Sequence, residues 1–287
     1  MKRVLVWLRT IRPQTLFASL VPVLVALWVV HHDHIPVVAY RPMLVGVLTA
    51  LCAVSLQVLA NLINDYYDFV RGADKAGRIG FKRALAEGEV SQRQMAMACL
   101  IALSIAVCTG AYLVLVGGWV ILAVGISAIL FAWLYTATSH SLAYLGIADI
   151  FVFLYYGVIA SAGTAYLLTH VFSQKVFYAG AVCGLISMCV LMINNLRDVD
   201  EDRGVGKRTL VVRVGKRIAE AVMLVEVLLM PLFAWLAFGI SPSMLVGVVG
   251  LILFFAVRRA KGTQYNKCLL CTGLMNVVYL ILVLLSS

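Results

Sequence analysis

Apolar runs long enough to cross a lipid bilayer follow one another along most of this 287-residue chain. A membrane-spanning helix needs about 20 predominantly apolar residues. Nine runs approach or reach that length, at residues 15–30, 43–63, 94–116, 119–138, 147–169, 176–196, 218–239, 242–257 and 268–285. The pattern predicts an all-α membrane protein with nine transmembrane helices in one bundle, and with residues 1–287 as a single integral-membrane domain.

The composition agrees with a membrane protein, since 63% of the residues are hydrophobic and only 13% are charged. The mean hydropathy is +1.01, far above that of soluble domains. A net charge of +10 can indicate nucleic-acid binding, but these bases lie in loops between apolar runs rather than on a soluble basic face. We therefore expect a lipid bilayer, and no nucleic acid, as the partner.

Lys and Arg residues indicate the orientation, because they concentrate in cytoplasmic loops. With the N-terminus inside, 21 of the 23 Lys and Arg residues lie on the cytoplasmic side, and only Arg41 and Lys175 lie outside. The basic N-terminus has no small-residue cleavage site, so we expect the first apolar run to be retained. The expected location is the inner (cytoplasmic) membrane.

A polar segment at the end of the second apolar run concentrates amide and acidic side chains. If the helix continues to Asp68, a spacing of i, i+3, i+4 and i+7 places four of them on one face: Asn61, Asn64, Asp65 and Asp68. Carboxylate and amide oxygens suit Mg²⁺, which takes its other ligands from water and from phosphate. The bases that follow would neutralise that phosphate: Arg71, Lys75, Arg78, Lys82 and Arg83.

The sixth apolar run ends in a second segment of the same design. Asn195, Asp198 and Asp202 are spaced i, i+3 and i+7, so they also share a helix face. Bases follow at Arg203, Lys207, Arg208 and Arg213. Because four spans separate the two segments, both face the cytoplasm, and we expect them to share one Asp-rich active site.

Asp149 lies near the start of the fifth apolar run. A carboxylate at or inside the membrane is costly and usually functional, although a water-exposed acid at a helix end is the alternative. No phosphate-binding glycine loop or nucleophile elbow is present in the sequence, so metal-assisted phosphate chemistry is favoured. Intramembrane carboxylates also occur in transporters, but transporter sites tend to lie near the midplane rather than at span ends.

Two Asp-rich segments at the cytoplasmic ends of the second and sixth spans resemble the UbiA superfamily of intramembrane aromatic prenyltransferases. The first motif of that family, NDxxDxxxD, is matched at Asn64, Asp65 and Asp68. Gly72 stands at its last position, and the acid comes two residues later, at Asp74. The second motif, DxxxD, is matched at Asp198 and Asp202.

Within the superfamily, the chain looks like the 1,4-dihydroxy-2-naphthoate polyprenyltransferases of menaquinone synthesis. Residues 12–16 are similar to the RPxTL stretch of these enzymes, residues 194–198 to NNxRD, and residues 206–213 to GKxTLxVR. The chain departs from the pattern at Leu145, where Arg is common, at Phe17, where Pro is common, and at residues 84–87. These departures leave the two acidic motifs intact.

The resemblance implies Mg²⁺-dependent transfer of a polyprenyl group from polyprenyl diphosphate to 1,4-dihydroxy-2-naphthoate, with loss of the carboxylate, to give demethylmenaquinone. It implies Mg²⁺ ligands at Asn64, Asp65, Asp68, Asp74, Asp198 and Asp202. Residues expected to contact the diphosphate or counter its charge are Asn61, Asn64, Arg12, Lys75, Arg83, Lys207 and Arg213.

For the acceptor, we expect Asp149, with Tyr144, to take the proton of a hydroxyl group. The lipid tail of the donor would lie among the apolar spans. Two alternatives stay open at this stage: a related prenyltransferase that uses another aromatic acceptor such as 4-hydroxybenzoate, and a membrane transporter. A non-catalytic membrane scaffold would not need two matched segments of acids and bases.

Overall fold

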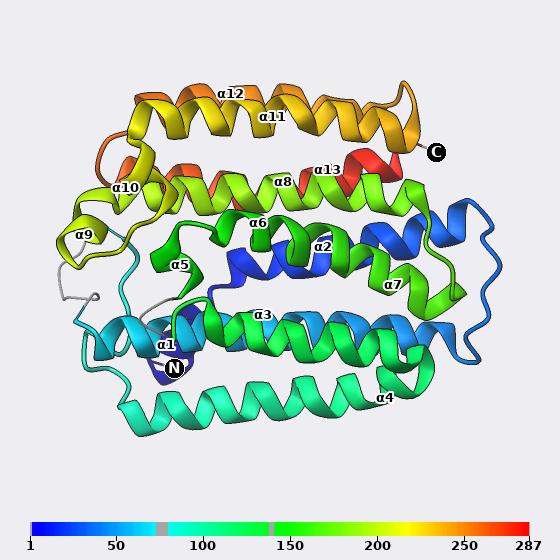
Figure 1. The fold of residues 1–287 in the computed structure, drawn as a ribbon, viewed down its shortest axis with the longest axis horizontal. Coiled ribbons are helices and arrows are strands. Elements are labelled where there is room, and N and C mark those ends of the chain that lie inside the picture. Colours follow the sequence, from blue (N-terminus) through cyan, green and yellow to red (C-terminus); the bar gives the residue numbers. More distant parts are fainter. Residues whose placement is uncertain (1, 73–79, 138–140, 287) are drawn as a thin grey trace.

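The computed structural model describes residues 2–72, 80–137 and 141–286, and every regular element in these ranges is a helix. In chain order the elements are α1 (Lys2–Ile11), α2 (Pro13–His32), α3 (Pro42–Val70), α4 (Gln92–Leu134), α5 (Leu142–Leu145), α6 (Ala148–Phe153), η1 (Leu154–Ile159), α7 (Ala160–Thr169), α8 (Gln174–Arg197), α9 (Val199–Gly204), α10 (Leu210–Val214), α11 (Lys216–Phe238), η2 (Pro242–Leu245), α12 (Val246–Arg259) and α13 (Gln264–Leu284). The long helices lie side by side along one direction (Figure 1). The predicted all-α class is confirmed.

Eight helical stretches in these described ranges are long and apolar enough to cross a membrane. They match the predicted spans to within a few residues, except that the third and fourth predicted spans both fall in α4. A straight helix of 43 residues would be about 65 Å long, roughly twice the thickness of the hydrocarbon core. The helix is broken at Gly118, where φ is 65° and ψ is −152°, and the chain doubles back (Figure 1). The predicted count of nine spans is not confirmed, because the part of α4 after the break, residues 119–134, is short for a crossing of its own.

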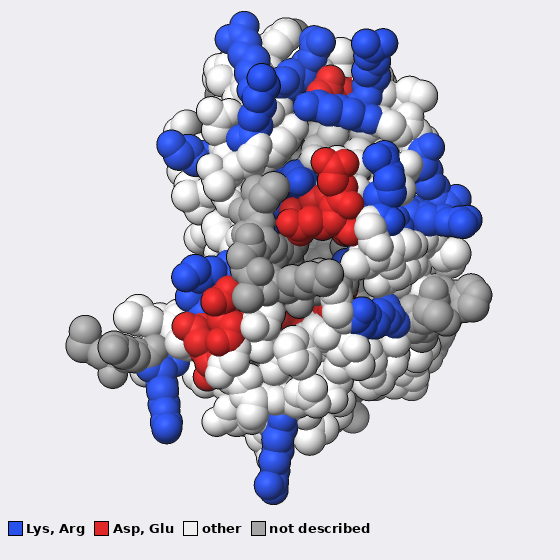
Figure 2. All heavy atoms as spheres, turned by 90° about the vertical axis from the view of Figure 1, so that its left-hand side faces the viewer, with Lys and Arg blue, Asp and Glu red and all other residues white. Residues whose placement is uncertain are grey.

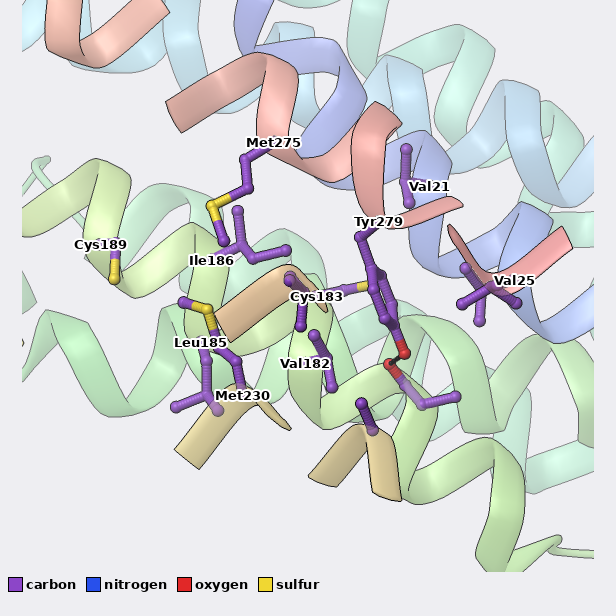
Figure 3. Packing of buried hydrophobic residues seen from close by; sticks show 14 of the residues in the cluster. Val21, Val25, Val182, Cys183, Leu185, Ile186, Cys189, Met230, Met275 and Tyr279 are labelled. Atoms are coloured by element: carbon purple, nitrogen blue, oxygen red, sulfur yellow. Dashed lines mark hydrogen bonds between the residues drawn. The ribbon is translucent and has the colours of Figure 1, made fainter. Parts of the chain in front are cut away.

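Helix α8 forms the centre of the bundle and packs against α2, α6, η1, α11 and α13. Its side chains Cys183 and Ile186 are fully buried, and Tyr279 of α13 packs beside them (Figure 3). The Tyr279 hydroxyl donates a hydrogen bond to the Ala179 carbonyl oxygen at 3.1 Å. Because the second acidic segment directly follows α8, this packing fixes its position.

Small residues allow α8 to approach the broken helix formed by α6, η1 and α7. A Cβ atom on Gly184 would lie 2.6 Å from the Phe153 carbonyl oxygen, and one on Gly157 would lie 2.6 Å from the Gly180 carbonyl oxygen. Close approach at small residues is a common way for membrane helices to pack. Within this contact, η1 is a π-helical turn, a feature that is often found at functional sites.

Large apolar side chains cover the outside of the bundle rather than only its core. Leu115 and Trp119 of α4 and Ile252 of α12 are all strongly exposed. Soluble monomers rarely expose extended apolar surface of this kind. Together with the eight apolar helices, this surface identifies a multi-pass membrane protein.

The glycine contact provides a test of the packing. Gly184→Ala should destabilise the protein by about 1 to 3 kcal/mol, because the added methyl group overlaps backbone atoms. Gly163→Ala is the matched control, since a Cβ atom there has no neighbour within 4 Å; its stability should stay unchanged or rise. Thermal unfolding in detergent would measure both, and equal melting temperatures for the two variants would contradict the observed packing.

Candidate active site

A cavity of about 770 Å³ extends into the bundle from the end where α3 and α8 finish. Its mouth is lined by charged residues, and every α4 residue that lines it is apolar. Figure 2 looks onto this end: acidic side chains border a hollow, and basic side chains surround them. The arrangement provides a charged mouth above an apolar chamber.

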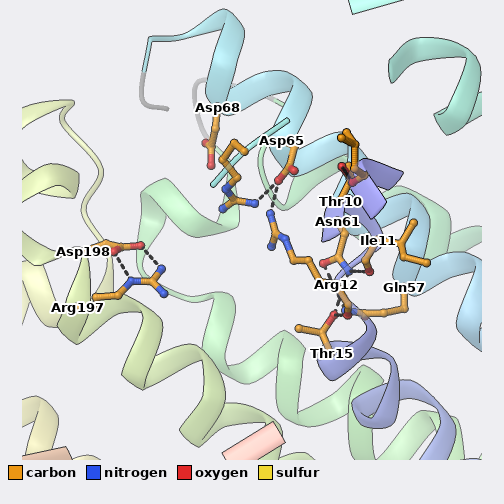
Figure 4. Close-up of polar contacts among 12 residues, drawn as sticks. Thr10, Ile11, Arg12, Thr15, Gln57, Asn61, Asp65, Asp68, Arg197 and Asp198 are labelled. Carbon is orange, nitrogen blue, oxygen red and sulfur yellow. Dashed lines mark hydrogen bonds and ion pairs between the residues drawn. The ribbon is translucent and has the colours of Figure 1, made fainter. Parts of the chain in front are cut away.

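The first acidic segment meets basic residues from other parts of the chain at this mouth. Asp65 and Asp68 share one face near the end of α3, and both are buried. Asp65 Oδ1 accepts hydrogen bonds from Arg12 Nη2 and Arg83 Nη1 (Figure 4). The guanidinium groups compensate the buried carboxylate, which would otherwise be strongly destabilising. The structure thus brings three of the predicted site residues together.

Arg12 is positioned by the sharp turn between α1 and α2. Its backbone is left-handed, with φ 54°, a conformation that residues other than glycine rarely adopt. Asn61 holds this turn, because its Nδ2 donates to the Ile11 carbonyl oxygen at 3.1 Å and to Thr15 Oγ1 at 3.0 Å (Figure 4). Asn61 also lines the cavity, so it both borders the site and supports the backbone that carries Arg12.

The second acidic segment lies across the mouth from the first. Asp198 accepts a bidentate pair of hydrogen bonds from Arg197, at 2.6 Å from Nε and 2.7 Å from Nη2. Arg197 Nη1 also donates to Asn266 Oδ1 of α13 at 2.9 Å. Arg197 was not among the predicted site residues, although its place beside Asp198 in the NNxRD stretch was an available signal. It ties the segment to α13.

Lys207 connects the two acidic segments. Its Nζ lies 3.0 Å from an Asp68 carboxylate oxygen and 4.0 Å from an Asp202 carboxylate oxygen. Burial acts to lower the pKa of Lys207, but the neighbouring Asp68 and Asp202 carboxylates outweigh it and raise that pKa above its ordinary value. The ammonium group therefore stays charged at neutral pH, and carboxylates separated by more than 130 residues lie around a single cation.

Not all of the remaining predicted residues lie at the mouth. Asn64 lines the cavity, and the Tyr144 ring centre of α5 lies 5.7 Å from Lys207 Nζ. Arg213 of α10 is exposed, and its Nε donates to the Arg208 carbonyl oxygen at 3.0 Å, so the structure does not bring it to the cavity. Three predicted residues fall outside the described ranges: Asp74, Lys75 and Arg78.

Asp149 is buried at the start of α6, and its Oδ1 has no hydrogen-bond partner within the described part of the chain. Asp149 does not belong to the described lining of the cavity, whereas Phe151 and Val152 do. The π-helical turn that follows brings the adjacent Tyr155 and Tyr156 both to the cavity wall. The role of Asp149 as a base for the acceptor stays a prediction.

Two carboxamides that the sequence did not single out also line the cavity, Gln57 of α3 and Asn276 of α13. Each is an isolated polar residue within an apolar run. Such a residue gives no local pattern that separates a site residue from one that packs inside the bundle. Only the tertiary structure identifies them as part of the cavity wall.

The donor atoms at the mouth fit Mg²⁺ in type. Mg²⁺ prefers oxygen ligands, and one or two carboxylates suffice when phosphate and water supply the rest. Among the described residues, no group of three or more His, Cys, Asp or Glu side chains is arranged around one point, and bases pair with the acids at the mouth. The Lys207 ammonium nevertheless lies between Asp68 and Asp202, which shows that one cation can meet both segments.

The turn that carries Arg12 provides a second test. Asn61→Leu should lower the free energy of unfolding by about 1 to 3 kcal/mol, since it leaves the Ile11 carbonyl oxygen, in a partly buried contact, without its side-chain donor. Asn64→Leu is the control on the same helix, because Asn64 faces the cavity, and it should change stability by less than about 0.5 kcal/mol. Equal losses in the two variants, measured by unfolding in detergent, would contradict the role given to Asn61.

Similar proteins share this architecture. A UbiA homolog from Archaeoglobus fulgidus, solved with GPP and Mg²⁺, superposes with a TM-score of 0.70 over 98% of this chain and 99% of that protein, at 18% identity. Digeranylgeranylglyceryl phosphate synthase superposes with a TM-score of 0.63 over 100% of this chain and 99% of that protein, at 15% identity. At these identities, the similarity establishes the fold.

Sequence comparisons extend the similarity. The 1,4-dihydroxy-2-naphthoate octaprenyltransferase of Escherichia coli K12 is 36% identical over 222 residues, which cover 73% of this chain and 68% of that enzyme. The Mycobacterium leprae enzyme of the same name is 30% identical over 96% of this chain and 94% of its own length. The model of the UbiA prenyltransferase family matches residues 19–278. The resemblance seen in the acidic motifs is confirmed, and the chain belongs to the UbiA prenyltransferase family.

Proposed function

We propose that this protein transfers a polyprenyl group from polyprenyl diphosphate to 1,4-dihydroxy-2-naphthoate, with loss of the carboxylate, to form demethylmenaquinone. One observation carries the proposal: two acidic segments and their bases surround the mouth of a large cavity whose α4 wall is entirely apolar. The charged mouth suits a diphosphate, and the chamber suits an isoprenoid tail. The similarity to the naphthoate octaprenyltransferases supports the choice of acceptor.

The bases at the mouth would bind the diphosphate and stabilise it as a leaving group. When the bond between the prenyl carbon and the diphosphate oxygen breaks, negative charge grows on the diphosphate. Preorganised positive charge at that place is usually the largest contribution to catalysis. Arg12, Arg83 and Lys207 line the cavity, so they would exchange their present carboxylate partners for phosphate oxygens. Lys75 and Arg213 stay predictions, the first outside the described ranges and the second away from the cavity.

The carboxylates released by this exchange would hold Mg²⁺. Asp65 and Asp68, with Asn64, would serve one ion, and Asp198 and Asp202 another; Asp74 is a further predicted ligand. When bound, Mg²⁺ would neutralise charge on the leaving diphosphate as a Lewis acid. The four acids of the two segments are buried at the mouth, where they would lie close to the diphosphate and away from bulk water.

The proposed placement in the membrane follows from the distribution of bases. If α4 crosses twice, with its reversal at Gly118, the eight spanning helices provide nine crossings. Both acidic segments would then face the cytoplasm. The protein would lie in the inner membrane as a single domain over residues 1–287. The tail of the substrate would lie among the apolar spans, in the chamber below the mouth.

An in vitro assay tests the proposed activity. Purified protein with Mg²⁺ and a polyprenyl diphosphate should prenylate 1,4-dihydroxy-2-naphthoate with a higher kcat/KM than 4-hydroxybenzoate. A higher kcat/KM for 4-hydroxybenzoate would identify that compound as the acceptor, and the proposed prenyl transfer would still hold. No product with any acceptor, together with counterflow of a solute in proteoliposomes, would instead indicate a transporter.

The shared site makes a specific kinetic prediction. Asp68→Asn and Asp202→Asn should each lower kcat by about 10² to 10³-fold, as expected for lost stabilisation of developing charge. Combining them should cost little more than either alone, because residues that act as one unit are not additive. Exposed Asp200→Asn is the control from the second segment and should retain activity. Multiplicative losses in the double variant would indicate two independent sites.

A further inference from the structure

A cluster of aromatic side chains lines the cavity where α4 meets α6 and η1. The Phe131 ring contacts the rings of Phe151 and Tyr155, with centroid distances of 4.4 Å and 4.9 Å and interplanar angles of 39° and 56°. All three residues line the cavity, and each is only partly buried. We call Phe131, Phe151 and Tyr155 the aromatic wall. Its rings contact one another and still leave surface open toward the cavity.

The aromatic wall lies about one helical turn below the charged mouth. Tyr135, which directly follows α4, also lines the cavity and lies within electrostatic range of Asp68 and Arg12. Phe131 comes four residues earlier, which places it about 6 Å farther along the helix from the mouth. This part of α4 returns toward the mouth after the break at Gly118 (Figure 1). The rings therefore lie just below the place where acids and bases meet.

Two separate elements build the aromatic wall. Phe151 and Tyr155 are four residues apart, so they share one face of the helix that α6 and η1 form. The π-helical turn brings Tyr156 to the cavity as well. Phe131 is supplied by the part of α4 that follows Gly118. The reversal of α4 therefore completes the aromatic wall.

The chemistry of the acceptor matches this placement. In 1,4-dihydroxy-2-naphthoate, both hydroxyl groups and the carboxylate lie on one ring, and the second ring carries no substituent. The prenyl carbon that reacts is bonded to the diphosphate, so the substituted ring of the acceptor must also reach the mouth. The second ring would then extend below it, at the depth of the aromatic wall. Aromatic rings pack favourably against one another in offset or edge-to-face arrangements.

The isoprenoid tail has a different surface available to it. The residues between positions 106 and 114 of α4 that line the cavity are aliphatic or glycine. Such side chains suit a flexible chain without polar atoms, because the burial of apolar surface is favourable in any orientation. The cavity volume of about 770 Å³ is within the usual range for small-molecule pockets. The aromatic wall is thus the part of the cavity that suits a planar ring.

We infer that the aromatic wall binds the unsubstituted ring of the acceptor and so selects a bicyclic acceptor over a single ring. Phe131 and Phe151 pack against this ring, and the hydroxyl and carboxylate groups of the acceptor point to the bases at the mouth. The inference rests on the proposed prenyl transfer and adds to it the residues that distinguish the naphthoate from 4-hydroxybenzoate. It gives the part of α4 after the break a direct part in substrate recognition.

Leucine variants test the inference, because they remove a ring and keep an apolar side chain. Phe131→Leu and Phe151→Leu should each raise the KM for 1,4-dihydroxy-2-naphthoate about three- to tenfold, the usual contribution of an aromatic contact. The KM for the prenyl diphosphate should stay within about twofold. Trp133→Leu is the matched control, since Trp133 lies on the same helix, is exposed and is not among the described lining residues of the cavity. It should change neither KM.

The quantity that changes separates acceptor binding from two other roles. If the aromatic wall stabilised positive charge on the prenyl group instead, both variants would lower kcat and leave the acceptor KM unchanged, which would overturn the inference. A lower melting temperature with an unchanged acceptor KM would mean that the rings only pack together, and would overturn it as well. If the wild-type protein forms no prenylated product from any acceptor, the proposed function fails instead, so the failures are distinct.

A pair of acceptor analogues gives the sharper result and needs no turnover. The ligands 1-hydroxy-2-naphthoate and 2-hydroxybenzoate carry the same neighbouring hydroxyl and carboxylate groups and differ by the second ring. Their dissociation constants should be measured by calorimetry in detergent for the wild type and for Phe151→Leu. The preference for the naphthoate should fall about threefold or more in the variant, because the substitution and the missing ring remove the same contact. An equal weakening of both ligands, or no change in either, would contradict the inference.

Discussion

The structure depends on the pairing of buried carboxylates with bases at one end of an otherwise apolar bundle. An isolated charge at that depth would be strongly destabilising, so each acid needs a nearby cation. Asp65 obtains it from Arg12 and Arg83, and Asp68 and Asp202 obtain it from Lys207. These pairs hold together segments that are far apart in the sequence and form the mouth of the cavity. The same pairs keep the bases at the mouth, where the proposed diphosphate would exchange with the carboxylates.

This pairing also explains how a membrane protein can combine a charged site with an apolar one, as the proposed prenyl diphosphate would need. The charges stay at the helix ends, while the α4 wall stays apolar. Helix α8 is fixed by packing with α11 and α13, and its close contact with the end of α6 requires glycine at position 184. A closely packed centre with a charged end provides two chemically different environments within one cavity.

The sequence was sufficient for some of these features and not for others. Hydrophobic runs located the spans to within a few residues, because each helix must cover the bilayer. The predicted boundary at residues 117 and 118 agrees with the break that the structure shows at Gly118. Helical spacing placed Asp65 and Asp68 on one face, yet which base pairs with which acid depends on tertiary contacts. Arg213 follows the second acidic segment closely and still does not line the cavity: it is exposed on α10, and its Nε donates to the Arg208 carbonyl oxygen. Asn276 had no pattern around it, because one polar residue in an apolar run has the same local sequence whatever it contacts.

The most direct test of a single shared site is equilibrium binding of a non-hydrolysable prenyl thiodiphosphate, measured by calorimetry in detergent with and without Mg²⁺. We predict one site per chain, tight binding only with Mg²⁺, and loss of that binding when the acid at either position 68 or position 202 is replaced by its amide. Two sites per chain, or binding that survives the change in one acidic segment and not in the other, would contradict the account.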